Sequence, residues 1–527
     1  MSAGLLESQR RVEYGDFQTP PELAKAICQA LRGERPATLL EPTCGTGAFL
    51  AAALDRFPRP GIALGFDINP RYVGAARRSV AETTSSAKRQ IRVADFFQTD
   101  WPSLVARYPE PLLILGNPPW VTNSALGVLG SSNLPPKQNL AGRSGLEGLT
   151  GKSNFDVSEW MIYRLLEAVA GRRATLAMLC KTAVARRVLA RAWETRLPIR
   201  SCEIRAIDAA RHFGARVEAC LLICRSGSDP AVVCDCRVFE SLESPQNNGS
   251  FGWRDGRLIA DVRAYDRVKH LLGGRARWRS GVKHDCAAVF EFREQADGTL
   301  VNGLGEAVDL EDDYLFPLLK SSDIAGTGGR FRTLSHSDGR GQGEGSFVTL
   351  GKSRTTALTP TLSRQTGRGS EITRLVLVPQ QRVGQETDSI AERAPKTWQY
   401  LLQHAERLDR RASRIYRGQP RFSIFGVGPY TFSPWKVAVS GFYKTPQFTA
   451  VGPLGSRAVI CDDTCYFLPC TSAAEARRLA GLLNGPLARE FFSAFVFPDA
   501  KRPLTAEILN SLDLAALAAA PGATDSP

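Results

Sequence analysis

The sequence predicts a doubly wound α/β fold with a mostly parallel sheet, followed by a second domain that mixes helices and strands (α+β). Between residues 36 and about 225, short apolar runs alternate with helix-length amphipathic stretches, the pattern of parallel strands joined by crossover helices. A glycine-rich turn follows the first of these runs, where sheets of this kind bind ligands. From about residue 241 the alternation stops, and aromatic residues, glycine and proline become more frequent.

The predicted strands are short apolar runs bounded by polar, glycine or proline residues, and the predicted helices carry apolar residues at helical spacing. We expect strands at Thr38 to Leu40, Ala63 to Phe66, Gln90 to Val93, Leu112 to Leu115, Ala174 to Leu179 and Cys220 to Cys224. We expect helices at Pro21 to Leu31, Ala48 to Arg56, Pro70 to Ala81, Ser158 to Ala170 and Ala183 to Glu194.

Two domains are expected, residues 1–240 with the parallel sheet and residues 241–527 with the mixed structure. A chain of 527 residues exceeds what one hydrophobic core usually organises. Within the second domain, residues 327–371 contain near-repeats of Thr, Ser, Gly and Arg with few apolar side chains. Such a composition buries too little surface to offset the entropy of ordering, so we expect a disordered insertion there.

The composition is ordinary for a globular protein, with 43% hydrophobic residues, 23% charged residues and a mean hydropathy of −0.17. Arg10 and Arg11 are not followed by the apolar core of a signal peptide, and no apolar run approaches the roughly 20 residues that cross a bilayer. We therefore expect a cytoplasmic protein that contacts no membrane. Its twelve cysteines are expected as reduced thiols, and because no paired C-x-x-C spacing occurs, no metal site is expected.

The charge balance favours a polyanionic partner. Lys and Arg number 67 against 53 Asp and Glu, which gives a net charge of +14 and an isoelectric point near 9.4. Contacts from Arg and Lys to phosphates supply most of the non-specific affinity of proteins for nucleic acids. An arginine-rich compositional bias would produce the same excess, so charge alone does not decide the partner.

The segment "LLEPTCGTGAFL", residues 39–50, runs from a strand through a glycine-rich turn into a helix. Ligands of doubly wound sheets bind beyond the carboxyl ends of strands, and glycines let the backbone approach the ligand closely. We therefore expect Glu41, Cys44, Gly45 and Gly47 to line a cofactor site. A tight structural turn in any α/β protein is the alternative explanation.

Acidic residues follow the next two strands. Asp67 in "LGFDINP" comes about 20 residues after the glycines, where a carboxylate can accept both ribose hydroxyls of an adenosine. Asp95 in "VADFF" is placed to accept the amino group of the cofactor adenine, while Phe96 packs on its ring. Asp95 could instead only cap the following helix.

The segment "LILGNPPW" carries the most specific chemistry, because a buried strand delivers Asn117, Pro118, Pro119 and Trp120 to the same edge of the sheet. The exocyclic nitrogen of adenine is a poor nucleophile because its lone pair is delocalised into the ring. If the Asn117 side-chain carbonyl and the Pro118 backbone carbonyl accept its two hydrogens, the lone pair becomes available. Two prolines stiffen the loop that holds these acceptors, and Trp120 offers a stacking face to a flipped base.

Taken together, these motifs make the chain resemble the gamma-type adenine-specific (N6) DNA methyltransferases of restriction-modification systems. The resemblance implies the class I S-adenosylmethionine-dependent methyltransferase fold, S-adenosyl-L-methionine as the cofactor, and a C-terminal target-recognition domain. It rests on specific motifs over roughly residues 14 to 225 and is looser over residues 280 to 515. The repeat-like residues 327–371 have no counterpart in the family pattern.

Three further segments extend the resemblance. The leading segment of the family is similar to "FQTPPELA", which implies Thr19 and Pro20 near the methionine carboxylate. A later segment is similar to "KSNFDVSEWMIYRLLE", which implies that Asn154 and Phe155 begin a helix beside the site. The segment "RHFGARVEACLLIC" is similar to the strand that offers a second aromatic ring to the flipped base, here Phe213.

The C-terminal half favours double-stranded DNA as the substrate. The segments "GVKHDCAAVFEF" and "FSIFGVGPYTFSPWKVAVSGFYKTPQF" interleave basic and aromatic residues and resemble target-recognition segments. An aromatic core with an exposed basic face is the structural alternative. Two other functions stay open: a methyltransferase for RNA bases or protein glutamine, and a catalytically silent DNA-binding specificity subunit. No nuclease motif is found, so a restriction endonuclease partner would be a separate polypeptide.

Overall fold

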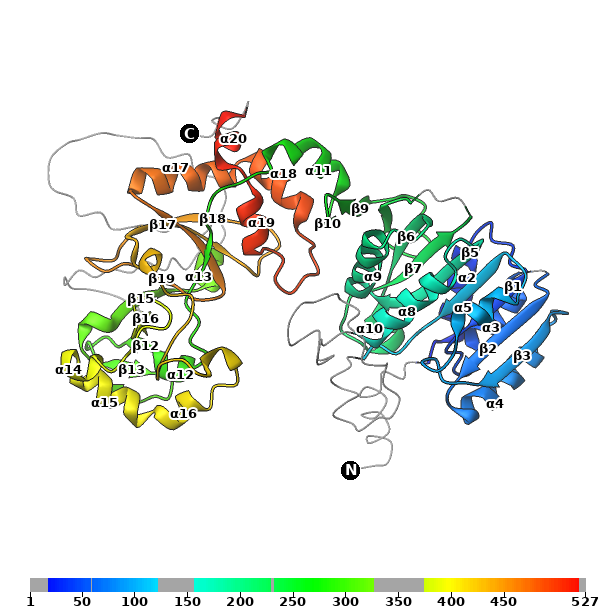
Figure 1. The fold of residues 1–527 in the computed structure, drawn as a ribbon, viewed down its shortest axis with the longest axis horizontal. Helices are drawn as coiled ribbons and strands as arrows, with labels where there is room; N and C mark the ends of the chain where they lie inside the picture. Colours follow the sequence, from blue (N-terminus) through cyan, green and yellow to red (C-terminus); the bar gives the residue numbers. More distant parts are fainter. Residues whose placement is uncertain (1–17, 58, 122–155, 229–231, 327–373, 521–527) are drawn as a thin grey trace. The chain divides into compact units, whose positions relative to one another are not determined.

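The computed structural model describes residues 18–57, 59–121, 156–228, 232–326 and 374–520. The chain divides into two compact units, Met1–Arg263 and Ala264–Pro527 (Figure 1). The predicted insertion at 327–371 and the predicted helix start at Asn154 and Phe155 lie outside the described residues.

Unit 1 alternates strands and helices along the chain, as the sequence pattern predicts. Its strands are β1 (Thr38–Glu41), β2 (Ile62–Asp67), β3 (Lys88–Val93), β4 (Leu112–Gly116), β5 (Ala174–Lys181), β6 (Ile199–Ile207), β7 (Ala219–Ser226), β8 (Asp235–Phe239), β9 (Gly249–Arg254) and β10 (Arg257–Ile259). Its helices are α2 (Pro21–Ala30), α3 (Ala48–Arg56), α4 (Pro70–Ala81), α5 (Trp101–Ala106), α8 (Val157–Ala168), α9 (Thr182–Glu194) and α10 (Ala209–Phe213).

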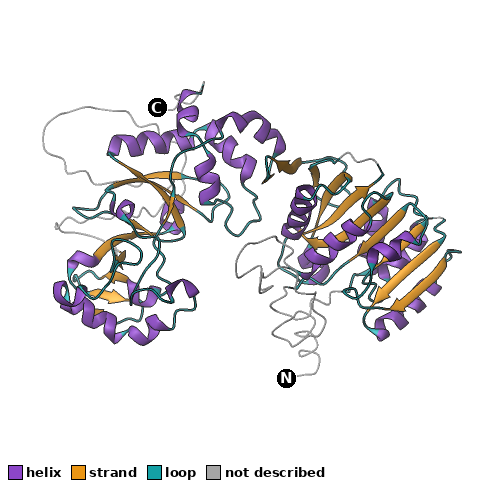
Figure 2. Cartoon of the chain, in the orientation of Figure 1, coloured by secondary structure: helices purple, strands orange, loops and turns teal. Residues whose placement is uncertain are grey.

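The ten strands form one sheet in the order β10-β9-β8-β6-β7-β5-β4-β1-β2-β3. All pairings among strands β1 to β5 are parallel, whereas β7 runs antiparallel to β5 and β6. Helices cover both faces of this sheet (Figure 2). These observations confirm the predicted doubly wound α/β fold with a mostly parallel sheet.

The central strands of unit 1 are buried because helices pack on both of their faces. All residues of β1 and β4 are buried, as parallel strands between two helical layers require. On one face, a core joins Leu23 of α2, Phe49 of α3 and Val73 of α4 to Leu39 and Leu113 of the sheet. Burial of each such side chain contributes roughly 1.5 to 3 kcal/mol to the stability of the folded protein. These apolar residues therefore stabilise the edge of the sheet where the strands end.

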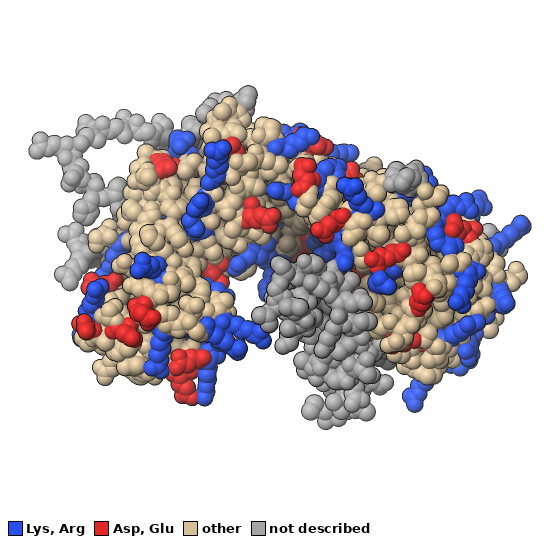
Figure 3. Space-filling view, viewed as in Figure 1, with Lys and Arg blue, Asp and Glu red and all other residues tan. Residues whose placement is uncertain are grey.

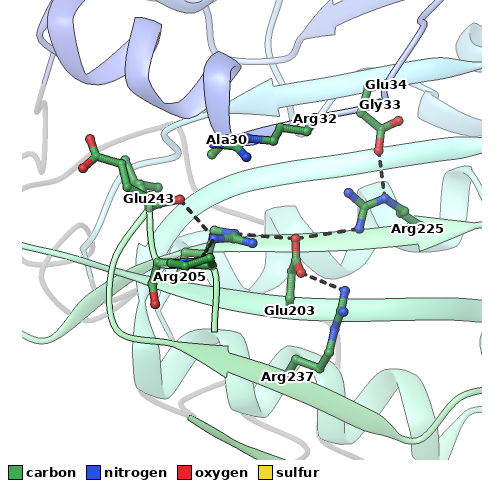
Figure 4. Close-up of a pocket in the computed structure, with 12 residues that line it drawn as sticks. Ala30, Arg32, Gly33, Glu34, Glu203, Arg205, Arg225, Arg237 and Glu243 are labelled. Carbon is green, nitrogen blue, oxygen red and sulfur yellow. Dashed lines mark hydrogen bonds and ion pairs between the residues drawn. The ribbon is translucent and has the colours of Figure 1, made fainter. Parts of the chain in front are cut away.

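Strand β6 is absent from the strands predicted by hydrophobic pattern, because its sequence "IRSCEIRAI" carries Arg200, Glu203 and Arg205. The structure buries the Glu203 carboxylate among guanidinium groups (Figure 4). Its oxygens lie 2.9 Å from Arg237 Nη2, 3.6 Å from Arg205 Nε and 3.8 Å from Arg225 Nη1. A prediction based on the alternation of apolar residues does not detect such a strand, because its charged residues interrupt the apolar pattern.

The same side chains line a pocket of about 540 Å³ on unit 1, with Arg32, Glu34 and Glu243 (Figure 4). Glu34 accepts a hydrogen bond from Arg225 Nε at 2.8 Å, so acidic and basic groups alternate around the pocket. None of the site residues predicted from the sequence lines it. Ion pairs between the side chains that line it therefore stabilise the walls of this pocket.

Unit 1 continues past residue 240, because β9 pairs with β8 and β10 pairs with β9 in the same sheet. Unit 2 contains two sheets, in the orders β11-β20-β17-β18 and β14-β13-β12-β16-β15-β19. Its strands are β11 (Arg279–Ser280), β12 (Glu291–Glu294), β13 (Leu300–Asn302), β14 (Ala307–Val308), β15 (Leu315–Leu319), β16 (Arg374–Leu377), β17 (Trp435–Ser440), β18 (Phe448–Val451), β19 (Ile460–Cys461) and β20 (Cys465–Cys470).

The helices of unit 2 pack around these two sheets, in keeping with the predicted α+β mixture. Helix α11 begins just before the boundary between the units. The helices are α11 (Val262–Val268), α12 (Ala287–Phe290), α13 (Ser321–Gly326), α14 (Ile390–Arg393), α15 (Pro395–Gln403), α16 (Ala405–Asp409), α17 (Ala473–Asn484), α18 (Pro486–Phe495), α19 (Ala506–Ser511) and α20 (Leu514–Ala519).

The two C-terminal segments that interleave basic and aromatic residues are paired in unit 2. Lys283 N–H donates to the Phe425 carbonyl at 2.8 Å, and Phe425 N–H donates back to the Lys283 carbonyl at 2.9 Å. Gly426 has a φ of +72°, and a Cβ there would lie 2.3 Å from the Gly281 carbonyl oxygen. Glycine is therefore required where these segments cross.

We predict that Glu203→Gln destabilises unit 1. The substitution leaves Arg205, Arg225 and Arg237 close together without their shared counter-charge. We expect the free energy of unfolding to fall by about 2 kcal/mol. Because Arg237 is half exposed, this loss is smaller than the loss caused by breaking a fully buried ion pair. Urea unfolding followed by circular dichroism measures it. Glu22→Gln, at an exposed pair with Lys25, is the control, and equal stability of the two variants would contradict the prediction.

Candidate cofactor and catalytic site

The candidate site lies where the strand order reverses. Strand β1 pairs in parallel with β2 on one side and with β4 on the other. Crossover connections leave in opposite directions from such a point, so the loops after these strands flank a crevice. The predicted glycine turn follows β1, Asp67 ends β2, and Asn117 follows β4. The topology thus brings these three parts of the predicted site to one edge of the sheet.

The glycine turn is a close-packed joint between β1 and α3. Gly47 N–H donates to the Cys44 carbonyl at 2.7 Å, and Cys44 N–H donates to the Phe66 carbonyl of β2 at 2.7 Å. Gly47 has a φ of +88°, and a Cβ there would lie 2.9 Å from the Ala76 Cα. No other residue fits this position without moving α4.

Asp67 fastens this turn to the end of β2. One carboxylate oxygen accepts a hydrogen bond from Gly45 N–H at 2.9 Å, and the other accepts one from Asn69 N–H at 2.8 Å. The side chain is half-buried, and each carboxylate oxygen has a second lone pair for a further donor. Asp67 therefore holds the turn, and its contact with a cofactor stays a prediction.

The leading segment lies against the same turn. Gln18 Oε1 accepts hydrogen bonds from Thr46 N–H at 3.2 Å and from Thr46 Oγ1 at 3.4 Å. Thr19 and Pro20 follow directly, are half-buried, and precede α2. The turn therefore presents a backbone N–H to an oxygen acceptor beside Thr19 and Pro20. Gln18 is not among the residues predicted from the sequence, although its position directly before Thr19 in "FQTPPELA" is a signal that points to it.

Asp95 and Phe96 follow β3, and both have partners nearby in the chain. Asp95 Oδ1 accepts a hydrogen bond from Phe97 N–H at 2.8 Å. Phe96 is only 6% exposed, and its ring lies 4.7 Å from Trp101 and 6.1 Å from Trp160, between centroids. Its contact with a cofactor ring stays a prediction. Ile68, directly after Asp67, is an exposed apolar side chain, with 49% of its surface accessible.

Glu41 and Cys44 are both buried in the joint. The Glu41 carboxylate accepts a hydrogen bond from Leu50 N–H at 3.2 Å, but burial raises the pKa of Glu41 well above its usual value, and nearby Asp67 raises it further. Burial also raises the pKa of the Cys44 thiol. A thiol held protonated in this way is a poor nucleophile.

The Asn-Pro-Pro-Trp segment leaves the buried end of β4. Pro118 and Trp120 are buried, and Asn117 and Pro119 are half-buried. The Trp120 ring lies edge-on to Phe213, with centroids 5.2 Å apart and an angle of 69° between the ring planes. The structure therefore places Phe213, 93 positions away in the sequence, next to the predicted catalytic segment.

Phe213 owes its place to the short helix α10. Asp208 caps this helix by accepting a hydrogen bond from Arg211 N–H at 3.0 Å, and Gly214 ends it with a φ of +66°. Phe213 packs on the same core as Trp120 and remains half-buried. Two aromatic rings from different parts of the chain thus meet beside Asn117.

Within the ranges 18–57, 59–121, 156–228, 232–326 and 374–520, no group of three or more His, Cys, Asp or Glu side chains is arranged to hold a metal ion. None of the helices in that part of the chain is long and apolar enough to span a bilayer.

Comparison with known proteins gives one relative along nearly the whole chain. The type II methyltransferase M.NspV of Nostoc sp. (strain ATCC 29411 / PCC 7524) is 41% identical over 513 residues, which cover 96% of this chain and 98% of M.NspV. The type II methyltransferase M.CvrRI of Paramecium bursaria Chlorella virus XZ-6E is 32% identical over 117 residues, which cover 22% of this chain and 27% of M.CvrRI. No protein-family model matches the chain.

Among solved structures, the type IIL restriction-modification enzyme MmeI in complex with DNA aligns with a TM-score of 0.51 and 12% sequence identity. The alignment covers 97% of this chain and 67% of the MmeI chain. At this identity the likeness concerns the fold.

The raised pKa of Glu41 predicts a pH dependence of stability. Below its ordinary value of 4.5 the group is protonated in both states; as pH rises the unfolded state ionises first, so stability falls until the folded pKa is reached. Glu41→Gln keeps an acceptor for Leu50 N–H and loses no stability in this way, so we expect the stability of the variant relative to wild type to increase as the pH rises above 4.5.

Urea unfolding of wild type and Glu41→Gln at several pH values measures this difference. Glu82→Gln, at an exposed glutamate after α4, is the control and should track wild type. A constant difference between Glu41→Gln and wild type across that range would show that Glu41 ionises normally in the folded protein.

Proposed function

Since the chain belongs to the type II methyltransferases, we propose that it methylates the N6 amino group of a flipped-out adenine at a specific site in double-stranded DNA. The observation that carries the proposal is the Asn117-Pro118-Pro119-Trp120 segment at the end of β4, with Phe213 packed against Trp120. We further propose that the chain works within a restriction-modification system, with any restriction endonuclease as a separate polypeptide.

The methyl donor is S-adenosyl-L-methionine, which supplies a methyl group activated by its sulfonium. The residues at the edge of the sheet fit this cofactor. Thr46 N–H already donates to one oxygen acceptor, Gln18 Oε1, and the methionine carboxylate is an acceptor of the same kind. Thr19, Pro20, Glu41, Cys44, Gly45 and Gly47 would surround the methionine end, Asp67 would accept from the ribose hydroxyls, and Asp95 and Phe96 would contact the adenine.

In this proposal Asn117 and Pro118 activate the adenine nitrogen. Their carbonyl oxygens would accept its two hydrogens, so its lone pair would leave the ring conjugation. The lone pair could then bond the methyl carbon as the sulfonium C–S bond breaks, and the nitrogen would afterwards lose one proton to solvent. The acceptors are held by the end of a buried strand and by two prolines, so little reorganisation is needed during transfer. Transfer is direct, since the buried and protonated Cys44 offers no nucleophile for a covalent intermediate.

The Trp120 and Phe213 rings would receive the extruded base. Extrusion costs a few kcal/mol of pairing and stacking, and an aromatic pocket offsets part of that cost. The edge-on contact at 5.2 Å closes the space between the two rings, so a base that enters between them must move at least one ring.

Unit 2 is proposed to recognise the DNA target. Lys and Arg side chains are spread over both units on the face drawn in Figure 3, interleaved with acidic ones. The paired segments around Lys283 and Phe425 bring basic and aromatic residues together, and Lys283 is 39% exposed along its side chain. Basic side chains would contact phosphates and polar ones would read base edges.

Sequencing that detects modified adenines tests the proposal directly. DNA from cells that carry the wild-type chain is compared with DNA from cells that carry Asn117→Ala. We expect N6-methyladenine at one recurring sequence with wild type and none with the variant. Methylation at cytosine, or no DNA methylation with an active protein, would overturn the proposed substrate.

In purified protein, we predict that Asn117→Ala reduces methyl transfer to DNA by at least about 1,000-fold, since it removes a preorganised acceptor. Asn117 follows β4 rather than the glycine turn, so the affinity for S-adenosylmethionine should stay within about 3-fold of wild type, a change below about 0.7 kcal/mol. Calorimetry gives the affinity and transfer of labelled methyl groups gives the rate. A rate of methyl transfer close to wild type in Asn117→Ala would show that Asn117 has no role in the reaction.

We predict that Trp120→Ala and Phe213→Ala weaken transfer to duplex DNA more than they weaken cofactor binding. Stacking on a protein ring contributes on the order of 1 to 3 kcal/mol per base, so each variant should lose about 5- to 150-fold in rate. A mismatched target adenine, already partly unstacked, should restore part of the rate. Fluorescence of 2-aminopurine at the target position reports extrusion, and a probe that stays quenched on binding wild type would exclude base flipping.

A further inference from the structure

We propose that Lys181 is a positioning residue for methyl transfer: its ammonium group fixes the peptide carbonyl of Trp120 and so sets the conformation of the Asn117–Trp120 loop. The inference rests on the proposed function of that loop and adds a residue to it. Lys181 is the last residue of β5, the strand next to β4 in the sheet.

The contact itself is direct. Lys181 Nζ donates a hydrogen bond to the Trp120 carbonyl at 3.0 Å and a second one to Asp156 Oδ2 at 2.7 Å. The side chain thus reaches from the end of β5 to the loop that follows β4. Hydrogen bonds from a charged donor are stronger than neutral ones, so this tie constrains the plane of the peptide that follows Trp120.

Asp156 holds the ammonium group in place. Its side chain is 4% exposed, and its Oδ1 accepts a hydrogen bond from Ser158 N–H at 3.1 Å, which caps α8. The two carboxylate oxygens therefore have separate tasks, one at the helix and one at Lys181. Helix α8 is packed into the core by Ile162 and Leu165, so the fold fixes the position of Asp156. The hydrogen bond from Lys181 to Asp156 in turn fixes the position of the ammonium group.

A backbone hydrogen bond completes the arrangement. Val157 N–H donates to the Val121 carbonyl at 2.8 Å. The consecutive carbonyls of Trp120 and Val121 are therefore both held, one by the Lys181 side chain at the end of β5 and one by the main chain at the start of α8. At its other end the loop continues from Gly116, which pairs with Met178 of β5.

The consequence is that the loop is fixed at both ends before any substrate binds. The proposed acceptors, Asn117 and Pro118, lie between the end of β4 and the Lys181 tie. A displacement of about 1 Å in a reacting group can cost about 100-fold in rate, so loss of the tie should act on the chemical step. Lys181 touches the loop and no reacting atom, so its role is one of position.

Removing Lys181 alone would leave the buried Asp156 carboxylate without a partner, which costs stability by itself. The test variant is therefore Lys181→Met combined with Asp156→Asn, since asparagine can still cap α8 and carries no charge. The control variant combines Arg187→Met with Glu159→Gln, which removes another ion pair between α9 and α8, at 2.6 Å, that does not involve the loop.

Single-turnover methyl transfer on the target duplex, calorimetric binding of S-adenosylmethionine and thermal unfolding are measured for each full-length variant. We expect K181M/D156N to lower the single-turnover rate by about 10- to 100-fold while the cofactor affinity stays within about 3-fold. The R187M/E159Q control should keep the wild-type rate. Lys181→Arg, which retains a charged donor, should recover most of the lost rate.

Three results would overturn the inference: a wild-type rate in K181M/D156N, an equal loss of rate in the control, or a loss of cofactor binding that matches the loss of rate. Asn117→Ala separates this inference from the proposed function. If Asn117→Ala is inactive and K181M/D156N is fully active, only the role of Lys181 fails. If Asn117→Ala is fully active, the proposed role of the loop fails as well.

Discussion

The parallel pairing of β1 with both β2 and β4 is the constraint on which the rest of unit 1 depends. It places the ends of three strands side by side, so Glu41, Asp67 and Asn117 reach one edge although they are far apart in sequence. The pairing is made by backbone hydrogen bonds and by apolar side chains that helices cover on both faces. The frame of the site is therefore set by the backbone pairing and the apolar core, and Glu41 and Asp67 add hydrogen bonds that attach α3 and the glycine turn to it.

The sequence predicts this frame well because each of its parts is encoded locally. Strands β1, β4 and β5 are short, continuous apolar runs, and the helices between them keep an apolar face at helical spacing. Gly47 is recognisable because only glycine tolerates its backbone angle and its contact with Ala76. The residues that follow such runs could therefore be assigned to the ends of these strands from spacing alone, and their roles in binding and catalysis stay predictions.

The features that escaped the sequence analysis depend on tertiary contacts. Strand β6 buries charges that are neutralised by arginines on β7 and β8, and no local pattern encodes that compensation. Phe96 is an aromatic residue in the expected place, yet its burial against Trp101 and Trp160 follows from the packing of α5 and α8. Lys181 ends an apolar strand and carries no motif; only the fold brings it to Trp120. Unit 2 pairs short strands over long sequence separations, for example Trp435 with Cys470, so its topology is the hardest part to predict.

The hydrogen bond between Val157 N–H and the Val121 carbonyl has an evolutionary consequence. It joins two backbone positions that lie 36 residues apart in the sequence, so the connection between them is closed at its base. Closing a longer connection costs only about 0.6 kcal/mol for each doubling of its length. Insertions or deletions between Val121 and Val157 are therefore compatible with an unchanged sheet and an unchanged Asn117–Trp120 loop, and related proteins can differ in chain length at this position.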